Sequence, residues 1–581
     1  MKAFSARGVM PRLMSASLLI GSAPLLAQDV PKTQQVQTGA NRAVLPLKHE
    51  PRPTSSAITT QDLMTRLYIY ADDSLGGRDV GTEGHFKATE YLAAEAKRMG
   101  LKPAGENGTY FQTLPLKSRR VDRLSSFVSG GTNVPLGSGW AFSGMESITT
   151  NDAEVVFAGP LSTASATAIS ADQARGRVVA YTITSNENFA QAREGRVERP
   201  AGSAGLLFIL PPQARGFLGF FLQSGLAVVD DSVPSDGRLW VSDSTALLMF
   251  GKSARLLTEG DVGAKLNVKA VVSVTAPAFP ARNVVALLEG SDPKLKNQYV
   301  AVGAHSDHVG TTPRGMDHDS ILVFNRIVRP GGAEDSDKFG TPEQFAEINA
   351  ELAERRKTQP TRRDSIFNGA DDDGSGTVAV QEIAEYLSSL KTKPKRSTLF
   401  VWHAGEEKGL WGSAFYTEHP TVPRDSIVAQ LNVDMVGRGS TTDVTGAGPD
   451  GKPLHGGPDY LQLVGSRRLS TELGDLVERV NKDKKHNFSF DYAMDANGHP
   501  MNIYCRSDHY EYAKWGIPVT FFTTGGHSAY HQLTDEPQYI DYPHMQRVTR
   551  LIADITLEVG NRATRPTVDG VKLDPRGSCK Q

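Results

Sequence analysis

The sequence predicts an α/β protein: a mostly parallel, doubly wound sheet flanked by helices, into which a mainly β module is inserted. Two observations predict this fold. From about residue 283 onwards, short apolar segments alternate with amphipathic segments of helical period, which is the pattern of βα units. From about residue 130 to residue 275, short β-like runs are instead separated by Gly and Pro, with few helical segments between them.

Length and charge set the broad class. A chain of 581 residues is long enough for more than one domain. Its 63 Lys and Arg residues against 65 Asp and Glu residues leave no basic excess of the kind that nucleic-acid binding needs. We expect this order of segments: a signal peptide at 1–27, an extended lead-in at 28–57, the start of the α/β domain at 58–129, the β module at 130–275, the rest of the α/β domain at 276–562, and a C-terminal tail at 563–581.

The first 27 residues have the pattern of a secretory signal peptide. Lys2, Arg7 and Arg12 precede a mostly apolar run at 13–26, and small Ala27 ends it. The run is too short and interrupted to span a bilayer, and no later run approaches the required length. Cleavage removes three positive charges and no negative one, so the formal charge changes from -2 to -5.

We therefore expect a periplasmic or secreted mature chain without a membrane anchor. Cys505 and Cys579 can pair in such an oxidising compartment. The sequence leaves a disulfide and two free buried thiols equally open.

The expected elements of the α/β domain follow from periodicity and from capping residues. Thr82 is a suitable N-cap for a helix that ends at Gly100. A polar insertion at 311–365 interrupts the βα pattern, and its charged piece at 343–356 is expected to be helical. Further helices are expected at 62–71, 377–390 and 543–559, and strands at 283–288, 299–304, 399–402, 429–434 and 518–523.

The residues that can carry chemistry lie where predicted strands end, which is where open α/β sheets bind ligands. His305 ends one strand, and Asp307 can hold its second ring nitrogen and fix its tautomer. Glu406 and Glu407 follow another strand. Because adjacent side chains leave the backbone in different directions, one glutamate can bind a metal while the other reaches the water on it.

Three consecutive carboxylates stand in the turn at 369–376, where they repel one another unless a cation is present or water screens them. A calcium loop fails on register, because its first and last ligand positions would be Gly369 and Val380. Asp434 ends an apolar strand, and His531 follows Tyr530 after another strand. Two histidines with several carboxylates suit zinc, with cobalt or manganese as substitutes, and a shared aspartate suits two metals. We interpret His308 and His403 as structural.

Five ordered blocks carry a family resemblance: residues 303–308 (GAHSDH), 368–376 (NGADDDGSG), 405–413 (GEEKGLWGS), 432–434 (NVD) and 530–531 (YH). They resemble the co-catalytic zinc aminopeptidases of peptidase clan MH, the family of bacterial leucyl aminopeptidases and glutamate carboxypeptidase. The resemblance covers roughly residues 58 to 560 and implies the zinc exopeptidase fold. The β module resembles a protease-associated (PA) domain.

The resemblance also implies roles for the matching residues. Asp372 would bridge two zinc ions, with His305 and Asp434 completing one site and Glu407 and His531 the other. Glu406 would be the general base, and Tyr530 would help to stabilise the tetrahedral intermediate. The Asp372–Asp373 peptide bond would be cis. The insertion at 311–365 is longer than the usual link between the first two ligands, so the choice of substrate stays open.

The expected function is a secreted or periplasmic aminopeptidase that hydrolyses N-terminal residues from peptides, using metal-activated water and Glu406. A dipeptidase or carboxypeptidase of the same family is a close alternative. A glutaminyl cyclase uses a single zinc ion, and non-catalytic relatives usually lack ligands, so the complete ligand set disfavours both. A serine hydrolase is disfavoured because Gly526-His-Ser-Ala-Tyr530 lacks the second glycine of Gly-x-Ser-x-Gly. The sequence does not address the oligomeric state or the preferred side chain.

Overall fold

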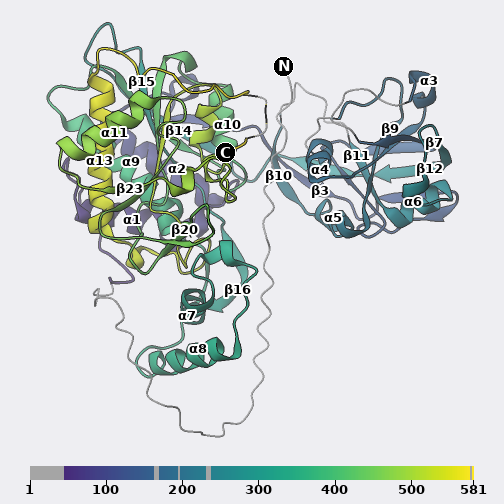
Figure 1. Ribbon diagram of the computed structural model, residues 1–581, viewed down its shortest axis with the longest axis horizontal. Helices are drawn as coiled ribbons and strands as arrows, with labels where there is room; N and C mark the ends of the chain where they lie inside the picture. Colours follow the sequence, from purple (N-terminus) through teal and green to yellow (C-terminus); the bar gives the residue numbers. More distant parts are fainter. Residues whose placement is uncertain (1–44, 162–168, 194–196, 230–236, 576, 578) are drawn as a thin grey trace. The chain divides into compact units, whose positions relative to one another are not determined.

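The computed structural model describes residues 45–161, 169–193, 197–229, 237–575, 577 and 579–581. The predicted signal peptide at 1–27 and the first part of the lead-in lie outside these residues. The chain forms two compact units: a β-rich unit from Pro115 to Ala278, and an α/β unit made of the described residues up to Leu114 and from Phe279 onwards (Figure 1). No helix in the described residues is long and apolar enough to cross a membrane.

A nine-stranded sheet forms the centre of the α/β unit, with the strand order β1-β14-β18-β15-β19-β24-β22-β23 and β2 also paired with β14. The four central strands β18, β15, β19 and β24 run parallel, and antiparallel pairs lie on both sides of them. The predicted α/β fold is therefore confirmed, with a mixed sheet that is parallel at its centre. The strands are β1 Lys102–Pro103, β2 Phe111–Thr113, β14 Arg282–Leu288, β15 Tyr299–His305, β18 Ser397–His403, β19 Ile427–Val433, β22 Tyr460–Val464, β23 Ser489–Asp491 and β24 Val519–Thr523.

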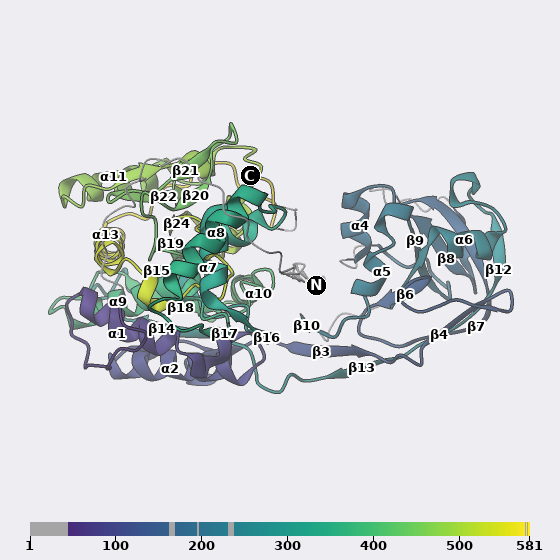
Figure 2. The ribbon, with the colours of Figure 1, turned by 90° about the horizontal axis from the view of Figure 1, so that it is seen from below.

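Helices cover both faces of this sheet, because successive apolar residues in the strands point to opposite sides. In β18, Phe400 and Trp402 join the large core with α1, α2, α9, α11 and α13, whereas Leu399 and Val401 join the core with α10 and α12. Figure 2 shows α9 and α13 on one side of the strands and α10 on the other. The helices are α1 Thr60–Tyr70, α2 Glu83–Arg98, α9 Gly376–Ser389, α10 Trp411–Glu418, α11 Thr471–Asp483, α12 His509–Ala513 and α13 Tyr542–Asn561.

The insertion at 311–365 is a folded substructure of the α/β unit. Its two ends pair as an antiparallel ladder of β16 (Thr311–Asp317) and β17 (Arg363–Ile366). Between them lie α7 (His318–Val328), the short helix η5 (Gly332–Asp335) and α8 (Pro342–Arg355). The expected helix at 343–356 is thus present as α8, which a capping box at Thr341 begins. The helix α7 is not predicted from the sequence, and its N-cap Asp317 makes no capping bond to the helix.

The β-rich unit begins at Pro115, earlier than the boundary at residue 130 that the composition suggested, because β3 and β4 belong to it. An eight-stranded sheet of order β5-β4-β12-β7-β8-β9-β11-β6 lies beside a three-stranded sheet, β10-β3-β13. Its assignment as a PA domain stays a prediction. The elements are β3 Leu116–Val121, β4 Ser126–Ser129, β5 Thr132–Asn133, β6 Trp140–Ser143, β7 Ile148–Pro160, β8 Val178–Thr182, β9 Gly205–Leu210, β10 Gly225–Val228, β11 Arg238–Ser242, β12 Val262–Ala270, β13 Val272–Thr275, α3 Ala171–Ala174, α4 Asn186–Arg193, α5 Phe217–Phe220 and α6 Asp243–Phe250.

The two cysteines of the chain form a disulfide. Cys505 and Cys579 are joined across 74 residues, with their Cα atoms 5.8 Å apart. Cys505 ends the short helix η9 (Ile503–Cys505), so the bond ties the C-terminal tail to the chain segment just before Arg506. The structure thereby selects one of the two alternatives that the sequence left open.

Candidate active site

The central parallel strands bring the predicted site residues to one edge of the sheet. His305 is the last residue of β15, and Asp434 follows β19 directly. Glu406 and Glu407 lie in the loop after β18, and His531 lies in the loop after β24. Asp372 comes from the turn before α9, in η6 (Ala370–Ser375). All these side chains are fully or partly buried.

One carboxylate, that of Asp372, joins two groups of side chains. Its Oδ1 lies 3.0 Å from Nε2 of His305, and its Oδ2 lies 2.9 Å from Nε2 of His531. Each imidazole faces a second carboxylate: Nε2 of His305 is 3.6 Å from Oδ1 of Asp434, and Nε2 of His531 is 2.9 Å from Oε2 of Glu407. The structure thus brings together all five residues that we expect to bind metal.

The other carboxylates of the acidic turn accept backbone amides from the segments around it. Asp373 accepts the backbone amides of His305, Gly376 and Met435 at 3.1, 2.8 and 3.2 Å. Asp371 accepts the amide of Gly437 at 2.6 Å. The peptide bond between Asp372 and Asp373 is cis, as the resemblance implies.

Asp535, which the sequence analysis did not single out, fixes this turn from outside. Its carboxylate accepts the amides of Asp371 at 3.0 Å and of Asp372 at 3.1 Å. Asp371 in turn lies 3.1 Å from Nε2 of His527. The loop that carries His531 therefore also positions the backbone of Asp372.

Asp307 holds the loop of the two glutamates. Its Oδ1 accepts the amides of Gly405 at 2.7 Å and of Glu406 at 3.1 Å. The expected partner of His305 Nδ1 was this carboxylate, but the nearer atom is the backbone carbonyl of Asp307, at 3.2 Å against 3.8 Å for Oδ1. We therefore infer that the carbonyl orients the imidazole and the carboxylate orients the loop.

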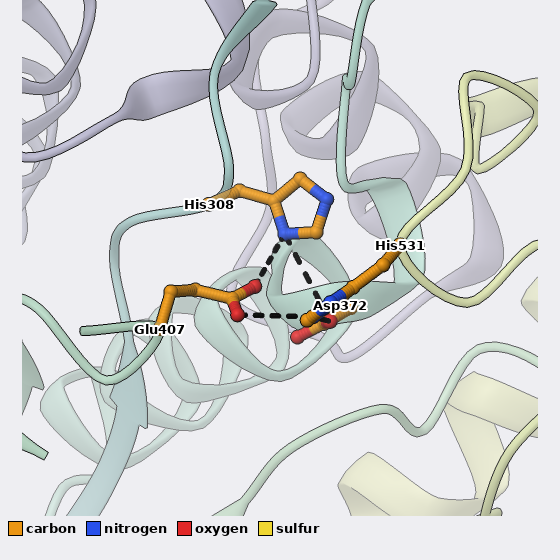
Figure 3. Close-up of side chains that lie close together, drawn as sticks. All are labelled: His308, Asp372, Glu407 and His531. Atoms are coloured by element: carbon orange, nitrogen blue, oxygen red, sulfur yellow. Dashed lines mark ion pairs between the residues drawn. The ribbon is translucent and has the colours of Figure 1, made fainter. Parts of the chain in front are cut away.

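His308 lies in the site, although the sequence analysis interpreted it as structural. Its Nδ1 is 2.7 Å from Oε1 of Glu407 and 3.8 Å from Oδ2 of Asp372. Figure 3 shows His308, Asp372, Glu407 and His531 pointing towards one another. No spacing rule marks His308, because it stands after the end of β15, where the alternation of strand side chains no longer applies.

The segment 506–508 also contributes to the site, and no sequence pattern predicts it. Ser507 donates a hydrogen bond of 2.8 Å from its Oγ to Oδ2 of Asp434 and accepts one of 2.9 Å from Asn432. Asp508 lies 3.4 Å from Nδ1 of His403. The interpretation of His403 as structural agrees with this contact and with its second one, at 2.9 Å to the hydroxyl of Tyr512.

Tyr530 packs its ring against His531, with the ring centroids 4.1 Å apart, and its hydroxyl accepts a hydrogen bond of 3.3 Å from Nη2 of Arg506. Burial raises the pKa of Tyr530 above its ordinary value, although the positive charges of His531 and Arg506 act against this. The phenol therefore stays protonated near neutral pH and can donate a hydrogen bond to a developing oxyanion.

The two adjacent glutamates differ in their affinity for a proton. Burial raises the pKa of Glu406 well above its ordinary value, and the negative charges of Glu407 and Asp434 add to this effect. Burial acts in the same direction on Glu407, but the charge of His531 and the hydrogen bonds from His308 and His531 hold its pKa at about 2. Glu407 is thus kept ionised, as a metal ligand must be, while Glu406 has a higher affinity for a proton.

The donor atoms fit metal ions. Oδ1 of Asp434 is buried without a hydrogen-bond partner. Imidazole nitrogen with carboxylate oxygen is a ligand set that zinc accepts. Among the described residues, the donor atoms within 4.8 Å of one another form two groups: His308, Asp372, Glu407 and His531, and His305, Asp373 and Asp434. Asp372 suits the second group better than Asp373, because both oxygens of Asp373 already accept backbone amides.

An open α/β sheet that gathers imidazoles and carboxylates around one shared aspartate, beside a glutamate with high proton affinity, defines a metal-dependent hydrolase. Residues 283–556 match the model of peptidase family M28. Residues 283–556, just under half of the chain, thus resemble a family of peptidases.

Relatives with names that describe an activity match smaller parts of the chain. Leucine aminopeptidase 1 of Sclerotinia sclerotiorum is 26% identical over 200 residues, which are 33% of this chain and 46% of the relative. Aminopeptidase Y of Saccharomyces cerevisiae is 26% identical over 201 residues, 32% of each chain. The chain thus spans less than half the length of these relatives. Among solved structures, an aminopeptidase from Aneurinibacillus sp. strain AM-1 is 15% identical over 89% of this chain and 97% of its own, with a TM-score of 0.44.

Proposed function

We propose that the protein is an aminopeptidase that removes N-terminal residues from peptides with the help of two zinc ions, for which cobalt or manganese can substitute. The observation that carries the proposal is the shared carboxylate of Asp372, whose two oxygens face His305 at 3.0 Å and His531 at 2.9 Å. In this proposal His305 and Asp434 complete one metal site, and Glu407 and His531 complete the other.

Bound metals would supply Lewis acidity towards the scissile carbonyl and towards the attacking water. Glu406 accepts the proton of that water and passes it to the leaving amine, which general acid–base catalysis requires. The hydroxyl of Tyr530 donates a hydrogen bond to the developing oxyanion. Asp307 and Asp535 keep the loops of Glu406 and Asp372 in place through backbone amides.

We further propose that residues 1–27 are removed and that the mature chain is periplasmic or secreted. The charge and apolar pattern of those residues supports this. The disulfide between Cys505 and Cys579 supports an oxidising compartment, because such bonds rarely persist in a reducing cytosol. Mass spectrometry of protein from the extracytoplasmic fraction tests the cleavage, and an intact residue 1 there would contradict it.

The central test is metal analysis of the purified full-length protein together with hydrolysis of leucine p-nitroanilide. We expect close to two zinc ions per chain. A strong chelator should abolish hydrolysis, and added zinc or cobalt should restore it. Full hydrolysis after verified removal of all metal would contradict the proposal. The Asp372→Asn variant should lose metal from both sites, because its carboxylate is the group that they share.

A further inference from the structure

Arg506 is a cation placed among the candidate catalytic residues. Its neighbour in sequence, Ser507, donates a hydrogen bond of 2.8 Å to Asp434. Its own Nη2 donates one of 3.3 Å to the hydroxyl of Tyr530, whose ring packs on His531. Arg506 is therefore tied to both halves of the site, on one side through the backbone and on the other through its guanidinium group.

The guanidinium group has a carboxylate partner from the insertion. Nη2 of Arg506 lies 2.5 Å from Oε1 of Glu334 in η5. The two side chains are 36% and 37% exposed, so solvent reaches this ion pair. Exposed ion pairs contribute little stability, so another carboxylate can replace Glu334 at small cost. Both contacts of Arg506 use Nη2, and an arginine fork offers further N–H groups on Nη1 and Nε.

The backbone of the insertion holds Glu334 in this position. Gly332 has a φ of 59°, and a Cβ atom there would lie 2.6 Å from the carbonyl oxygen of Tyr530. The amide of Ala333 donates a hydrogen bond of 3.1 Å to that same oxygen. η5 therefore lies directly against the loop of Tyr530 and His531, an approach that only glycine permits at position 332.

The base of the insertion is fastened to the same loop region. Nη1 of Arg362 lies 2.7 Å from Oε1 of Glu536, and Nε2 of His318 lies 2.7 Å from its Oε2. With these contacts at the base and with Gly332 at η5, the insertion is fixed at two places. These contacts hold the carboxylate of Glu334 in a defined position beside Tyr530.

We infer that Arg506 binds a carboxylate of the peptide substrate, and that Glu334 forms an ion pair with Arg506 when no substrate is bound. This inference rests on the proposed function. In that function the hydroxyl of Tyr530 faces the scissile carbonyl, so a group held by Arg506 belongs to a residue at the scissile bond. The arginine fork matches a carboxylate in shape and charge.

Among the residues of the substrate, the leaving residue is the one that brings a carboxylate to Arg506. Burial acts to lower the pKa of Arg506, but Tyr530 and the negative charges of Glu334 and Glu406 raise it above its ordinary value. Glu406 passes its proton to the leaving amine in the proposed function, so the side of the site near Glu406 receives the leaving residue. Its C-terminal carboxylate, present when the substrate is a dipeptide, would meet Arg506. An acidic side chain on the same residue is the second source of a carboxylate.

Three substrates separate these sources: Leu-Gly, its amide Leu-Gly-NH2, and Leu-Glu-NH2. The readout is the ratio of kcat/KM for Leu-Gly to that for Leu-Gly-NH2, because this ratio cancels general effects on the site. Wild-type protein should favour Leu-Gly. Arg506→Gln should lower the ratio by about 10- to 100-fold, the range for a lost charge-assisted hydrogen bond. Arg506→Lys should retain part of the ratio, because it keeps the charge without the fork.

Glu334→Gln should raise the ratio a few-fold, because it removes the competing carboxylate and keeps the shape of the side chain. Arg326→Gln is the matched control: Arg326 pairs with Glu351 within the insertion, between α7 and α8, and its loss should leave the ratio unchanged. A fall of the ratio in Glu334→Gln would overturn the part assigned to Glu334. An equal loss on Leu-Gly and Leu-Gly-NH2 in Arg506→Gln would overturn the inference, because it would reduce Arg506 to a link between two loops.

A binding measurement separates this inference from the proposed function. Calorimetry with the metal-loaded Glu406→Gln variant measures the affinity for Leu-Gly and for Leu-Gly-NH2 without turnover. Suppose that Leu-Gly binds more tightly than Leu-Gly-NH2 and that this difference depends on Arg506. If the wild-type protein then hydrolyses none of the substrates, only the proposed function is contradicted. Hydrolysis without any preference for a carboxylate would contradict this inference alone. A preference for Leu-Glu-NH2 that Arg506→Gln abolishes would support the carboxylate site and assign it to the side chain.

Discussion

His308 lies with its Nδ1 2.7 Å from Oε1 of Glu407, so two imidazoles hold one carboxylate. His531 contacts the other oxygen, Oε2, at 2.9 Å. Both rings are close to each other, with centroids 5.4 Å apart. Glu407 is thereby fixed in one orientation and kept ionised, whereas Glu406, its neighbour in sequence, has a raised pKa.

We expect His308→Ala to weaken the metal that Glu407 and His531 hold, because the carboxylate loses the group that orients it or the metal loses a ligand. Loss of such an orienting group costs about 10- to 100-fold in metal affinity. Competition with a chromogenic chelator measures both sites in one titration. The exposed His419→Ala is the control and should match wild type. Two unchanged affinities in His308→Ala would return His308 to a structural role.

Glu407→Gln should lose one metal and keep the other. The substitution removes a charged ligand, and an amide is a poor ligand for zinc. Metal analysis after dialysis should find close to one zinc ion per chain, with hydrolysis falling in step. If two ions remain tightly bound, Glu407 is not a ligand.

Glu406→Gln should keep both metals and lose the reaction. The amide has the size of the carboxylate but cannot accept the proton, and general acid–base catalysis is worth about 100- to 10,000-fold. This corresponds to roughly 3 to 5 kcal/mol of barrier. The loss should appear in kcat and not in KM, because substrate binding keeps its contacts. Steady-state kinetics on an aminoacyl anilide measure it, and a variant within a few-fold of wild type would exclude Glu406 as the base.

The sequence predicted the site wherever a residue stands next to the end of a strand. Asp434 follows β19 directly, so the pattern of the strand places it. Residues that reach the site from separate loops and stand in none of the recognised motifs were missed. Ser507 contacts Asp434 from 73 residues away, and Asp535 contacts the amide of Asp372 from 163 residues away. Neither contact has a local signal in the sequence, because only the folded sheet brings those loops together.

Local sequence signals also account for which parts of the fold could be predicted. Amphipathic periodicity and caps placed the long helices such as α9 and α13, and apolar runs placed the central strands. The boundary of the β-rich unit moved to Pro115 because β3 is polar along much of its length and carried no apolar signal. The helix α7 was missed because the polarity of the whole insertion concealed its apolar face, in which Val323 and Val328 pack against Ile348.

Deletion of the β-rich unit should leave the metal site intact. Its two core clusters contain residues of 115–278 alone, and the two large clusters of the α/β unit contain none of them. The ends to be joined are adjacent, because the amide of Leu114 donates to the carbonyl of Ala281 at 2.9 Å. A chain with 115–278 replaced by a short Gly-Ser linker should bind metal like the full chain. A folded deletion variant without metal would show that the unit supports the site.

Finally, His509 should make the stability of the α/β unit depend on pH. Its ring is fully buried and stacks on Phe521, with centroids 4.8 Å apart. Burial lowers the pKa of His509 from 6.5 to about 3, against the raising effect of Asp508, while Arg468 lowers it further. The pKa of His509 is lower in the folded state than in the unfolded state. The contribution of His509 to stability is therefore complete above pH 6.5 and is lost as the pH falls towards 3.

Each pKa unit corresponds to about 1.36 kcal/mol. The titration of His509 should therefore lower the free energy of unfolding by roughly 2 kcal/mol between pH 7 and pH 5. His509→Phe keeps an aromatic ring against Phe521 and removes the titration, so its stability should fall less over the same interval by about that amount. Tyr504→Phe is the control, because it alters a ring 5.5 Å from His509 without removing a group that titrates in this interval. Urea unfolding at the two pH values measures the difference. Parallel losses in wild type and His509→Phe would show that the buried imidazole does not govern the acid sensitivity.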